Sequence, residues 1–150
     1  MLNRTSFVKL NKNYDSRGFF SEIVRVSNYK FNFSKTQISH SRVKKNIIKG
    51  WHGHKKQHQW NYVVRGSILL ILYDNNPKSF TYKQYYKKII DCKFDNYAYF
   101  FSPGILHSYK CLSNSLDIIY ITSDIYDVAN EIKINLNNKK IKYDWYKKTK

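Results

Sequence analysis

The sequence of 150 residues carries 27 Lys and Arg against 10 Asp and Glu, a formal net charge of +17, and 42% of its residues are apolar. This length predicts a single domain over residues 1–150, long enough to bury a core. Five Gly and two Pro exclude collagen-like and low-complexity chains, and no apolar run reaches the length of a membrane span. Without such a span we expect no membrane as a partner. Because the lysines are scattered through most of the chain, we expect no nucleic acid either, and the charge favours an anionic ligand such as a phosphate.

The N-terminal stretch "MLNRTSFVKLNKNYDSRGFF" has no apolar run followed by small residues, so we expect no signal peptide. Two cysteines, Cys92 and Cys111, are too few for a disulfide framework. Reduced thiols and a cytoplasmic location are therefore expected.

Short β-rich runs separated by polar turns follow one another along the chain, which predicts an all-β sandwich or barrel. Gly66 in "WNYVVRGSILLILY" permits a tight turn between two strands. The stretch "DIYDVANEI", residues 124–132, predicts only a short helical turn. The expected strands cover residues 6–10, 19–26, 36–43, 47–54, 60–73 with its turn, 80–90, 97–101, 107–112 and 115–123.

The segment "GWHGHKKQHQW", residues 50–60, concentrates three histidines before an apolar strand. If the segment is extended, His52 and His54 point to the same face. One hypothesis is a metal site, since His52, His54 and the distant His107 resemble the metal-binding pattern of cupin barrels. The carboxylate of that pattern falls on Gln59, a poor ligand for a transition metal.

A second hypothesis for the same histidines is proton transfer. Epimerising a carbon beside a carbonyl needs a base, a donor to the enolate oxygen and an acid on the opposite face. His52 can serve as the base and Tyr120 as the acid, while Lys49, Lys55 and His107 can stabilise an oxyanion or a phosphate. The alternative without function is a solvated edge strand.

Motifs in a constant order resemble the dTDP-4-dehydrorhamnose 3,5-epimerase family, from about residue 15 to 145. "DSRGFFSE" is similar to its Asp-x-Arg-Gly-x-Phe-x-Glu start, "TQISHS" to its Gln-x-Asn-x-Ser strand, and "KGWH" to its Arg-Gly-Leu-His. "QWNYVVRGSILLILYD", "FFSPGILHSY", "DIIYITSDIYDVANE" and "KKIKYDW" resemble the later motifs. The resemblance implies a cupin-type jelly-roll β-barrel, no cofactor and no metal, and a homodimer that exchanges an N-terminal strand.

The resemblance also implies the role of each matching residue. His52 is expected to be the base, and Tyr120, thirteen residues past His107, the opposing acid. Arg17 and Lys49 suit a diphosphate. The residues expected to bind the nucleotide sugar are Arg17, Glu22, Gln37, Ser39, Lys49, His54, Gln59, His107 and Glu131.

Several positions depart from the family pattern. Gln59 stands at the family's Lys, Lys49 at its Arg and Ser39 at its Asn. The family places an Asp beyond the Ile-x-Trp motif that orients the catalytic His, whereas "WYKKTK" follows here. We therefore expect either another residue to hold His52 in its tautomer or an altered, slower chemistry, because losing such a group costs orders of magnitude in rate.

"GWHGHKK" is also similar to the Gly-x-His-Ala-His-Lys motif of the sugar 3,4-ketoisomerases, in which His52 and His54 would share a proton shuttle. We predict an epimerase of a dTDP- or UDP-linked 4-keto-6-deoxyhexose, acting at C3, C5 or both, whose product enters deoxysugar synthesis for a glycan. The rivals are the ketoisomerase, a metal-dependent cupin, and a sugar-binding barrel without enzymatic activity.

Overall fold

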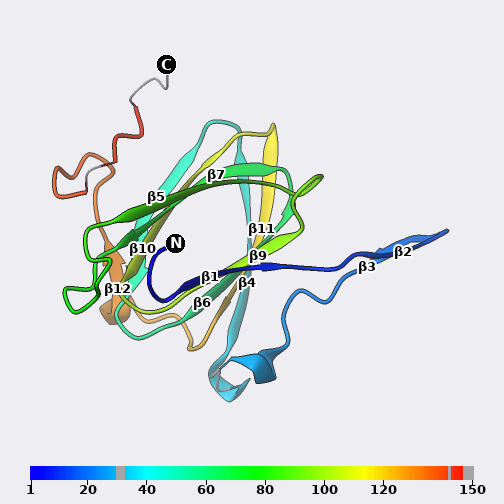
Figure 1. The fold of residues 1–150 in the computed structure, drawn as a ribbon, viewed down its shortest axis with the longest axis horizontal. Helices are drawn as coiled ribbons and strands as arrows, with labels where there is room; N and C mark the ends of the chain where they lie inside the picture. Colours follow the sequence, from blue (N-terminus) through cyan, green and yellow to red (C-terminus); the bar gives the residue numbers. More distant parts are fainter. Residues whose placement is uncertain (30–32, 142, 147–150) are drawn as a thin grey trace.

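The computed structural model describes residues 1–29, 33–141 and 143–146, and two five-stranded antiparallel sheets face each other in it as a jelly-roll barrel (Figure 1). The first sheet has the order β1 (Thr5–Lys9), β9 (Tyr97–Phe101), β6 (Gln59–Arg65), β11 (Ser115–Thr122) and β4 (Gln37–Lys44). The second has the order β12 (Glu131–Lys133), β5 (Ile48–His54), β10 (Ile105–Cys111), β7 (Ser67–Asp74) and β8 (Tyr85–Asp91). The expected all-β barrel is confirmed.

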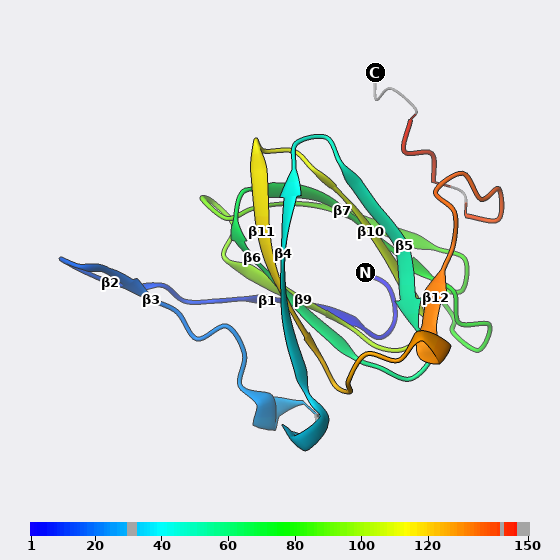
Figure 2. The same cartoon turned by 180° about the vertical axis from the view of Figure 1, so that it is seen from behind.

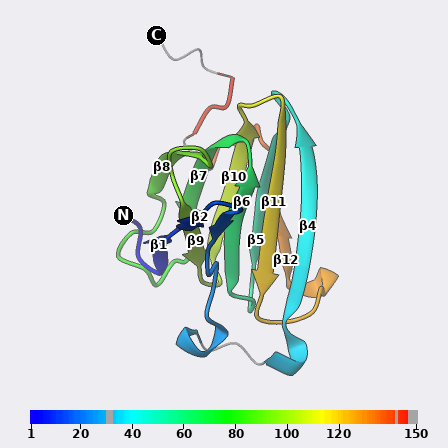
Figure 3. The same cartoon turned by 90° about the vertical axis from the view of Figure 1, so that its right-hand side faces the viewer.

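The space between the sheets is filled by an apolar core on one side only. β4 and β11 lie at one flank of the barrel and β8 at the opposite flank (Figure 3). Along each strand, alternate residues point inward, and the buried cluster between the sheets includes Val63, Leu70, Leu72, Phe101 and Ile118. The same alternation on β4, β5 and β12 supplies polar residues, which leaves a cavity described below.

Both tryptophans of the histidine segment lie on outer faces. Trp51 packs on the outside of the second sheet with Trp145 and Ile141 from the chain after β12, which runs along the outside of the barrel (Figures 1 and 2). Trp60 packs on the outside of the first sheet. Strand parity therefore turns His52 and His54 inward, a choice that the sequence pattern left open.

The N-terminal arm differs from the expected strand over residues 19–26. β2 (Asn13–Asp15) and β3 (Gly18–Phe20) form a hairpin that projects away from the barrel (Figures 1 and 2). After Phe20 the backbone has no strand partner in the described part of the chain, and it continues to the 3₁₀ turn η1 (Val26–Asn28). The predicted strand over residues 19–26 was therefore wrong beyond Phe20.

The turns of the chain include one further difference from the predicted strands and one confirmed prediction. Residues 79–84 form turns rather than the start of the expected strand 80–90, because buried Asp74 accepts hydrogen bonds from the hydroxyls of Ser79 and Thr81, each 2.5 Å long. The expected helical turn is confirmed as η3 (Val128–Asn130), which Asp127 caps through the backbone N–H of Ala129. A third 3₁₀ turn, η2, covers Phe33–Lys35.

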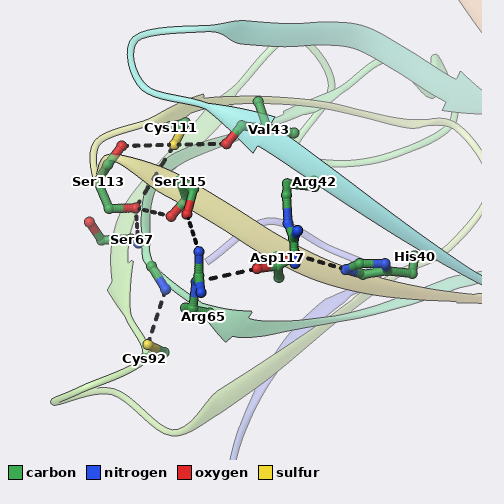
Figure 4. Close-up of polar contacts among 11 residues, drawn as sticks. His40, Arg42, Val43, Arg65, Ser67, Cys92, Cys111, Ser113, Ser115 and Asp117 are labelled. Atoms are coloured by element: carbon green, nitrogen blue, oxygen red, sulfur yellow. Dashed lines mark hydrogen bonds and ion pairs between the residues drawn. The ribbon is translucent and has the colours of Figure 1, made fainter.

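A charged cluster joins three strands of the first sheet on its outer face (Figure 4). Asp117 on β11 accepts from Arg42 Nε at 2.8 Å and lies 3.4 Å from Arg65 Nε and 3.0 Å from His40 Nε2. The hydrogen bond from Arg42 is the main cause of the lowered pKa of Asp117. This cluster fixes the edge strand β4 against β11 and β6.

Within the described residues, no helix has the length and apolar character needed to cross a bilayer.

Candidate active site

A cavity of about 250 Å³ opens between the two sheets on the side that the core leaves free. β4, β6 and β11 contribute from the first sheet, and β5, β10 and β12 from the second. Its lining residues are Ser39, Ser41, Lys49, His52, His54, Gln59, His107, Tyr109, Tyr120, Thr122 and Glu131.

Two glycines bring β5 close to β10 beneath this cavity. Gly50 has φ +119°, and a Cβ there would lie 2.7 Å from the carbonyl oxygen of His107. A Cβ on Gly53 would lie 2.6 Å from Leu106 Cδ2. With both side chains absent, β5 and β10 pair with His52 directly opposite His107, so the histidines from distant parts of the sequence meet.

His52 has a carboxylate partner on one ring nitrogen. Its Nδ1 lies 3.1 Å from Oε1 of Glu131, a side chain that is 13% exposed. The resemblance had implied only that Glu131 contacts the substrate.

A chain of amides fixes the orientation of His54. Asn61 Nδ2 donates to the carbonyl oxygen of Tyr99 (3.3 Å), Gln59 Nε2 donates to Asn61 Oδ1 (2.6 Å), and His54 Nε2 lies 2.8 Å from Gln59 Oε1. Gln59 Oε1 can only accept, so His54 Nε2 carries a hydrogen. Burial lowers the pKa of His54, and its Nδ1 is then the unprotonated nitrogen at neutral pH.

His107 is the most deeply buried of the three imidazoles, at 8% exposure. Its ring lies 4.7 Å from that of Phe101, measured between centroids, and 6.1 and 6.3 Å from His52 and His54. Burial holds its pKa well below the ordinary value. His107 is therefore a neutral imidazole at physiological pH and can offer one N–H donor.

Tyr120 enters the cavity from the sheet opposite His52. Its hydroxyl lies 2.7 Å from the hydroxyl of Tyr109 and 3.3 Å from Ser41 Oγ. Burial raises the pKa of Tyr120 and, further, that of Tyr109. Both phenols are thus protonated at neutral pH, and the Tyr120 hydroxyl has a second hydroxyl in hydrogen-bond contact.

Not every residue expected at the site lines this cavity. Gln37 lies beside it, where its amide donates to Ser39 Oγ at 2.9 Å and its oxygen accepts from the backbone of Tyr126 at 2.9 Å. Lys55 instead donates to the carbonyl oxygen of Ala129 at 2.8 Å.

Arg17 and Glu22 belong to the N-terminal arm, away from the cavity of their own chain. The Arg17 side chain is 88% exposed and pairs with Asp15 at 2.6 Å, while Glu22 pairs with Arg25 at 2.8 Å. These two residues can line a site only if the arm reaches another molecule.

Three lining residues escaped the sequence analysis: Ser41, Tyr109 and Thr122. Each stands two residues beyond an expected site residue on the same strand, namely Ser39, His107 and Tyr120. The period of two in a β-strand was the signal that could have found them.

The histidine rings do not form a metal-binding group in the described part of the chain, where no set of three or more His, Cys, Asp or Glu side chains has an arrangement that could hold an ion.

An all-β jelly roll whose interior holds an apolar core beside a histidine-lined cavity belongs to the cupin class of barrels, as the resemblance implied. Within that class the chain belongs to the dTDP-4-dehydrorhamnose 3,5-epimerase family, whose sequence model matches residues 2–150. This confirms the family predicted from the motifs and, with it, the prediction that the protein is an enzyme.

Individual relatives agree with this assignment. The chain is 32% identical over 153 residues to the spore coat polysaccharide biosynthesis protein SpsL of Bacillus subtilis (strain 168), covering 97% of each chain. It is 27% identical over 139 residues to the dTDP-4-dehydrorhamnose 3,5-epimerase of Escherichia coli (strain K12), covering 87% of this chain and 74% of the relative.

The fold matches solved structures as well. One is dTDP-6-deoxy-D-glucose-3,5-epimerase RmlC from Legionella pneumophila Philadelphia 1 in complex with dTDP-4-keto-L-rhamnose, with a TM-score of 0.85 at 21% identity over 97% of this chain and 80% of that one. A dTDP sugar isomerase from Desulfovibrio desulfuricans G20 gives a TM-score of 0.87 at 16% identity, over 96% and 92% of the two chains.

Proposed function

We propose that this protein epimerises a dTDP-linked 4-keto-6-deoxyhexose at C3, C5 or both, through an enolate. The observation that carries the proposal is the cavity itself, which His52 lines from one sheet and Tyr120 from the other. Inverting a carbon requires removal of a proton from one face of the sugar and its return on the opposite face. A base and an acid on facing walls satisfy that requirement.

The reaction divides into two proton transfers. His52 takes the proton from the carbon beside the ketone, and the electrons move to the carbonyl oxygen to form an enolate. Tyr120, a neutral phenol because burial raises its pKa, then donates its proton to the carbon from the other side. The hydroxyl of Tyr109, 2.7 Å away, donates a hydrogen bond to the resulting phenolate. Exchange with solvent water then returns a proton to Tyr120 and removes one from His52 before the next turnover.

The enolate oxygen needs hydrogen-bond donors that are already in place. His107 lines the cavity as an imidazole whose pKa is lowered by burial, so it offers an N–H donor without a full charge. Lys49, exposed at the cavity, suits the diphosphate, for which an ammonium is an effective partner. No cofactor takes part in either transfer.

The relatives support the substrate class. The Escherichia coli relative is a dTDP-4-dehydrorhamnose 3,5-epimerase, and the Legionella structure contains dTDP-4-keto-L-rhamnose. The Bacillus subtilis relative is a spore coat polysaccharide biosynthesis protein. We propose accordingly that the product enters deoxysugar synthesis for a surface polysaccharide, with UDP as the nucleotide to be tested against dTDP.

We also propose a homodimer in which the N-terminal arm completes the partner's site. The arm exposes Tyr14 (72%), Phe19 (53%) and Phe20 (70%), and the outer face of the first sheet exposes Ile38 (70%). Apolar side chains at this exposure favour contact with another surface. The family pattern assigns Arg17 to the site. A second copy of this chain, in contact with the arm, would place Arg17 at a cavity.

A cytoplasmic location is part of the proposal. Cys92 and Cys111 are both free thiols, which is the state expected in a reducing compartment.

The deciding experiment is proton NMR of a dTDP-4-keto-6-deoxyhexose with the protein in deuterium oxide. Deuterium at C3 alone indicates a monoepimerase, and deuterium at C3 and C5 a 3,5-epimerase. Migration of the ketone to C3 would instead support the ketoisomerase that shares protons between His52 and His54. Binding without any exchange would refute enzymatic function.

Two controls accompany this measurement. His52→Asn should abolish deuterium incorporation, and an unchanged rate would remove His52 from the mechanism. Elemental analysis of the purified protein tests the metal-dependent rival, which requires a stoichiometric transition metal and loss of activity on its removal.

A further inference from the structure

The contact between His52 and Glu131 is built by strand pairing rather than by a flexible loop. β12 pairs with β5 in antiparallel register, with Lys133 opposite His52 and Glu131 opposite His54. The carboxylate of Glu131 reaches diagonally to Nδ1 of His52 at 3.1 Å. A diagonal neighbour in a sheet is within reach of a long side chain, so backbone hydrogen bonding determines the position of this carboxylate.

The second oxygen of the carboxylate is held separately. Oε2 of Glu131 accepts from Lys133 Nζ at 2.9 Å and from the hydroxyl of Tyr126 at 3.1 Å. These contacts leave Oε1 directed at His52 and restrict rotation of the carboxylate.

The charge of Glu131 decides where the hydrogen of His52 lies. Partial burial raises the pKa of Glu131, but the hydrogen bonds from Lys133, His52 and Tyr126 outweigh burial and lower the pKa overall. An ionised carboxylate only accepts hydrogen bonds. Nδ1 of His52 must therefore carry a hydrogen, and in the neutral ring Nε2 holds the lone pair.

We propose that Glu131 is a positioning residue that holds His52 in the Nδ1–H tautomer and keeps Nε2 as the base for the sugar carbon. The inference rests on the proposed role of His52 as that base. It assigns to β12 the orienting function that the family pattern places in an aspartate after the Ile-x-Trp motif. Glu131 acts through the imidazole and need not touch the substrate.

This role predicts a particular kinetic effect. A residue that binds the sugar in its ground state changes KM when it is replaced, whereas one that orients the base changes kcat. Removing the orienting carboxylate of a catalytic His elsewhere lowers kcat by about 10⁴-fold. For Glu131→Gln we expect a loss in kcat on the order of 10²- to 10⁴-fold, with KM changed by less than about threefold.

The tautomer itself can be read without turnover. In uniformly ¹⁵N-labelled protein, long-range ¹H–¹⁵N correlations distinguish the Nδ1–H from the Nε2–H form of each imidazole. The wild-type protein should show His52 as Nδ1–H at neutral pH. In Glu131→Gln the amide can donate as well as accept, so the signals should move toward the Nε2–H form.

Two further variants complete the test. Glu131→Asp retains a carboxylate on a shorter arm and should keep the Nδ1–H form and recover at least about tenfold of the lost kcat. Asp144→Asn removes one negative charge from an exposed side chain away from the cavity, and should leave kcat, KM and the tautomer unchanged. Thermal melts establish that each variant is folded, and Glu131→Asp carries the test if Glu131→Gln is not.

The outcomes separate the two proposals. A wild-type protein with no deuterium exchange refutes the proposed function, while the tautomer measurement still decides the role of Glu131. An unchanged His52 tautomer in Glu131→Gln, an effect on KM alone, or a Glu131→Asp variant without recovery would overturn the positioning role.

Discussion

Tyr120→Phe separates the two proton transfers of the proposed reaction. The variant keeps His52 but has no phenolic proton to return, so inversion should slow by about 10²- to 10⁴-fold, the usual contribution of a general acid. This is about 3–5 kcal/mol of transition-state stabilisation at 1.36 kcal/mol per tenfold. Exchange of the substrate's α-hydrogen should continue, because His52 can remove the proton and return a deuteron to the same face.

The structure also sets a stability cost for this variant. Losing the Tyr120 hydroxyl leaves the Tyr109 hydroxyl, in a residue only 3% exposed, without its 2.7 Å partner. An unpaired buried hydroxyl costs about 1–3 kcal/mol. In a chain of this length 1 kcal/mol corresponds to about 2–4 °C, so Tm should fall by about 2–12 °C.

The matched control is Tyr109→Phe, which breaks the same hydroxyl pair and retains Tyr120. Tyr120 keeps its 3.3 Å contact with Ser41, so Tm should fall by no more than in Tyr120→Phe and inversion should lose less than about tenfold. The assay is NMR in deuterium oxide, with exchange and inversion followed in the same sample. Inversion at the wild-type rate in Tyr120→Phe, or an equal loss in both variants, would refute the assignment of the acid.

Three other perturbations test the frame of the site. Gly53→Ala forces a methyl group against Leu106, 2.6 Å away. Thermal melts should show an unfolding free energy lower by about 1–3 kcal/mol, and kinetics a lower kcat. A stable, active variant would contradict the close packing of β5 on β10. Because the pKa of Asp117 is lowered in the folded state, its stabilisation is present above the unfolded pKa and lost as the pH falls through the folded one. Asp117→Asn should therefore have a lower Tm than wild type at about pH 6, with the difference closing as the pH falls below the ordinary pKa of an Asp side chain. The double variant Phe19→Glu, Phe20→Glu should sediment as a monomer with reduced activity, whereas an unchanged dimer would exclude the arm from the interface.

Strand parity predicted which histidines of the site lie on one face. Alternation predicted that His52 and His54 share a face, and the family resemblance implied that Tyr120 opposes His52 as the acid. What parity cannot give is which face is inside, because Trp51 and Trp60 are as apolar as any core residue. The C-terminal segment covers Trp51, and a pattern confined to one strand contains no information about that cover.

The role of Glu131 was outside the reach of the sequence for a related reason. β12 has only three residues, too few to show a period, and its pairing with β5 joins positions 79 residues apart. Similarly, Gln59 was noted as a lost cation, whereas its amide fixes the orientation of His54. The first contact depends on register between paired strands, and the second on how the two sheets face each other. Propensity and periodicity specify neither.

Because Trp51 and His52 are neighbours in the chain, the packing of the C-terminal segment on Trp51 affects the position of the proposed base. Trp51 is the anchor on which Ile141 and Trp145 rest, and the next side chain along the same backbone is the proposed base. Removing or loosening the C-terminal segment that contains Ile141 and Trp145 should therefore slow turnover while the barrel remains folded. Proteolysis of this outer segment would lower the activity of the enzyme without unfolding it.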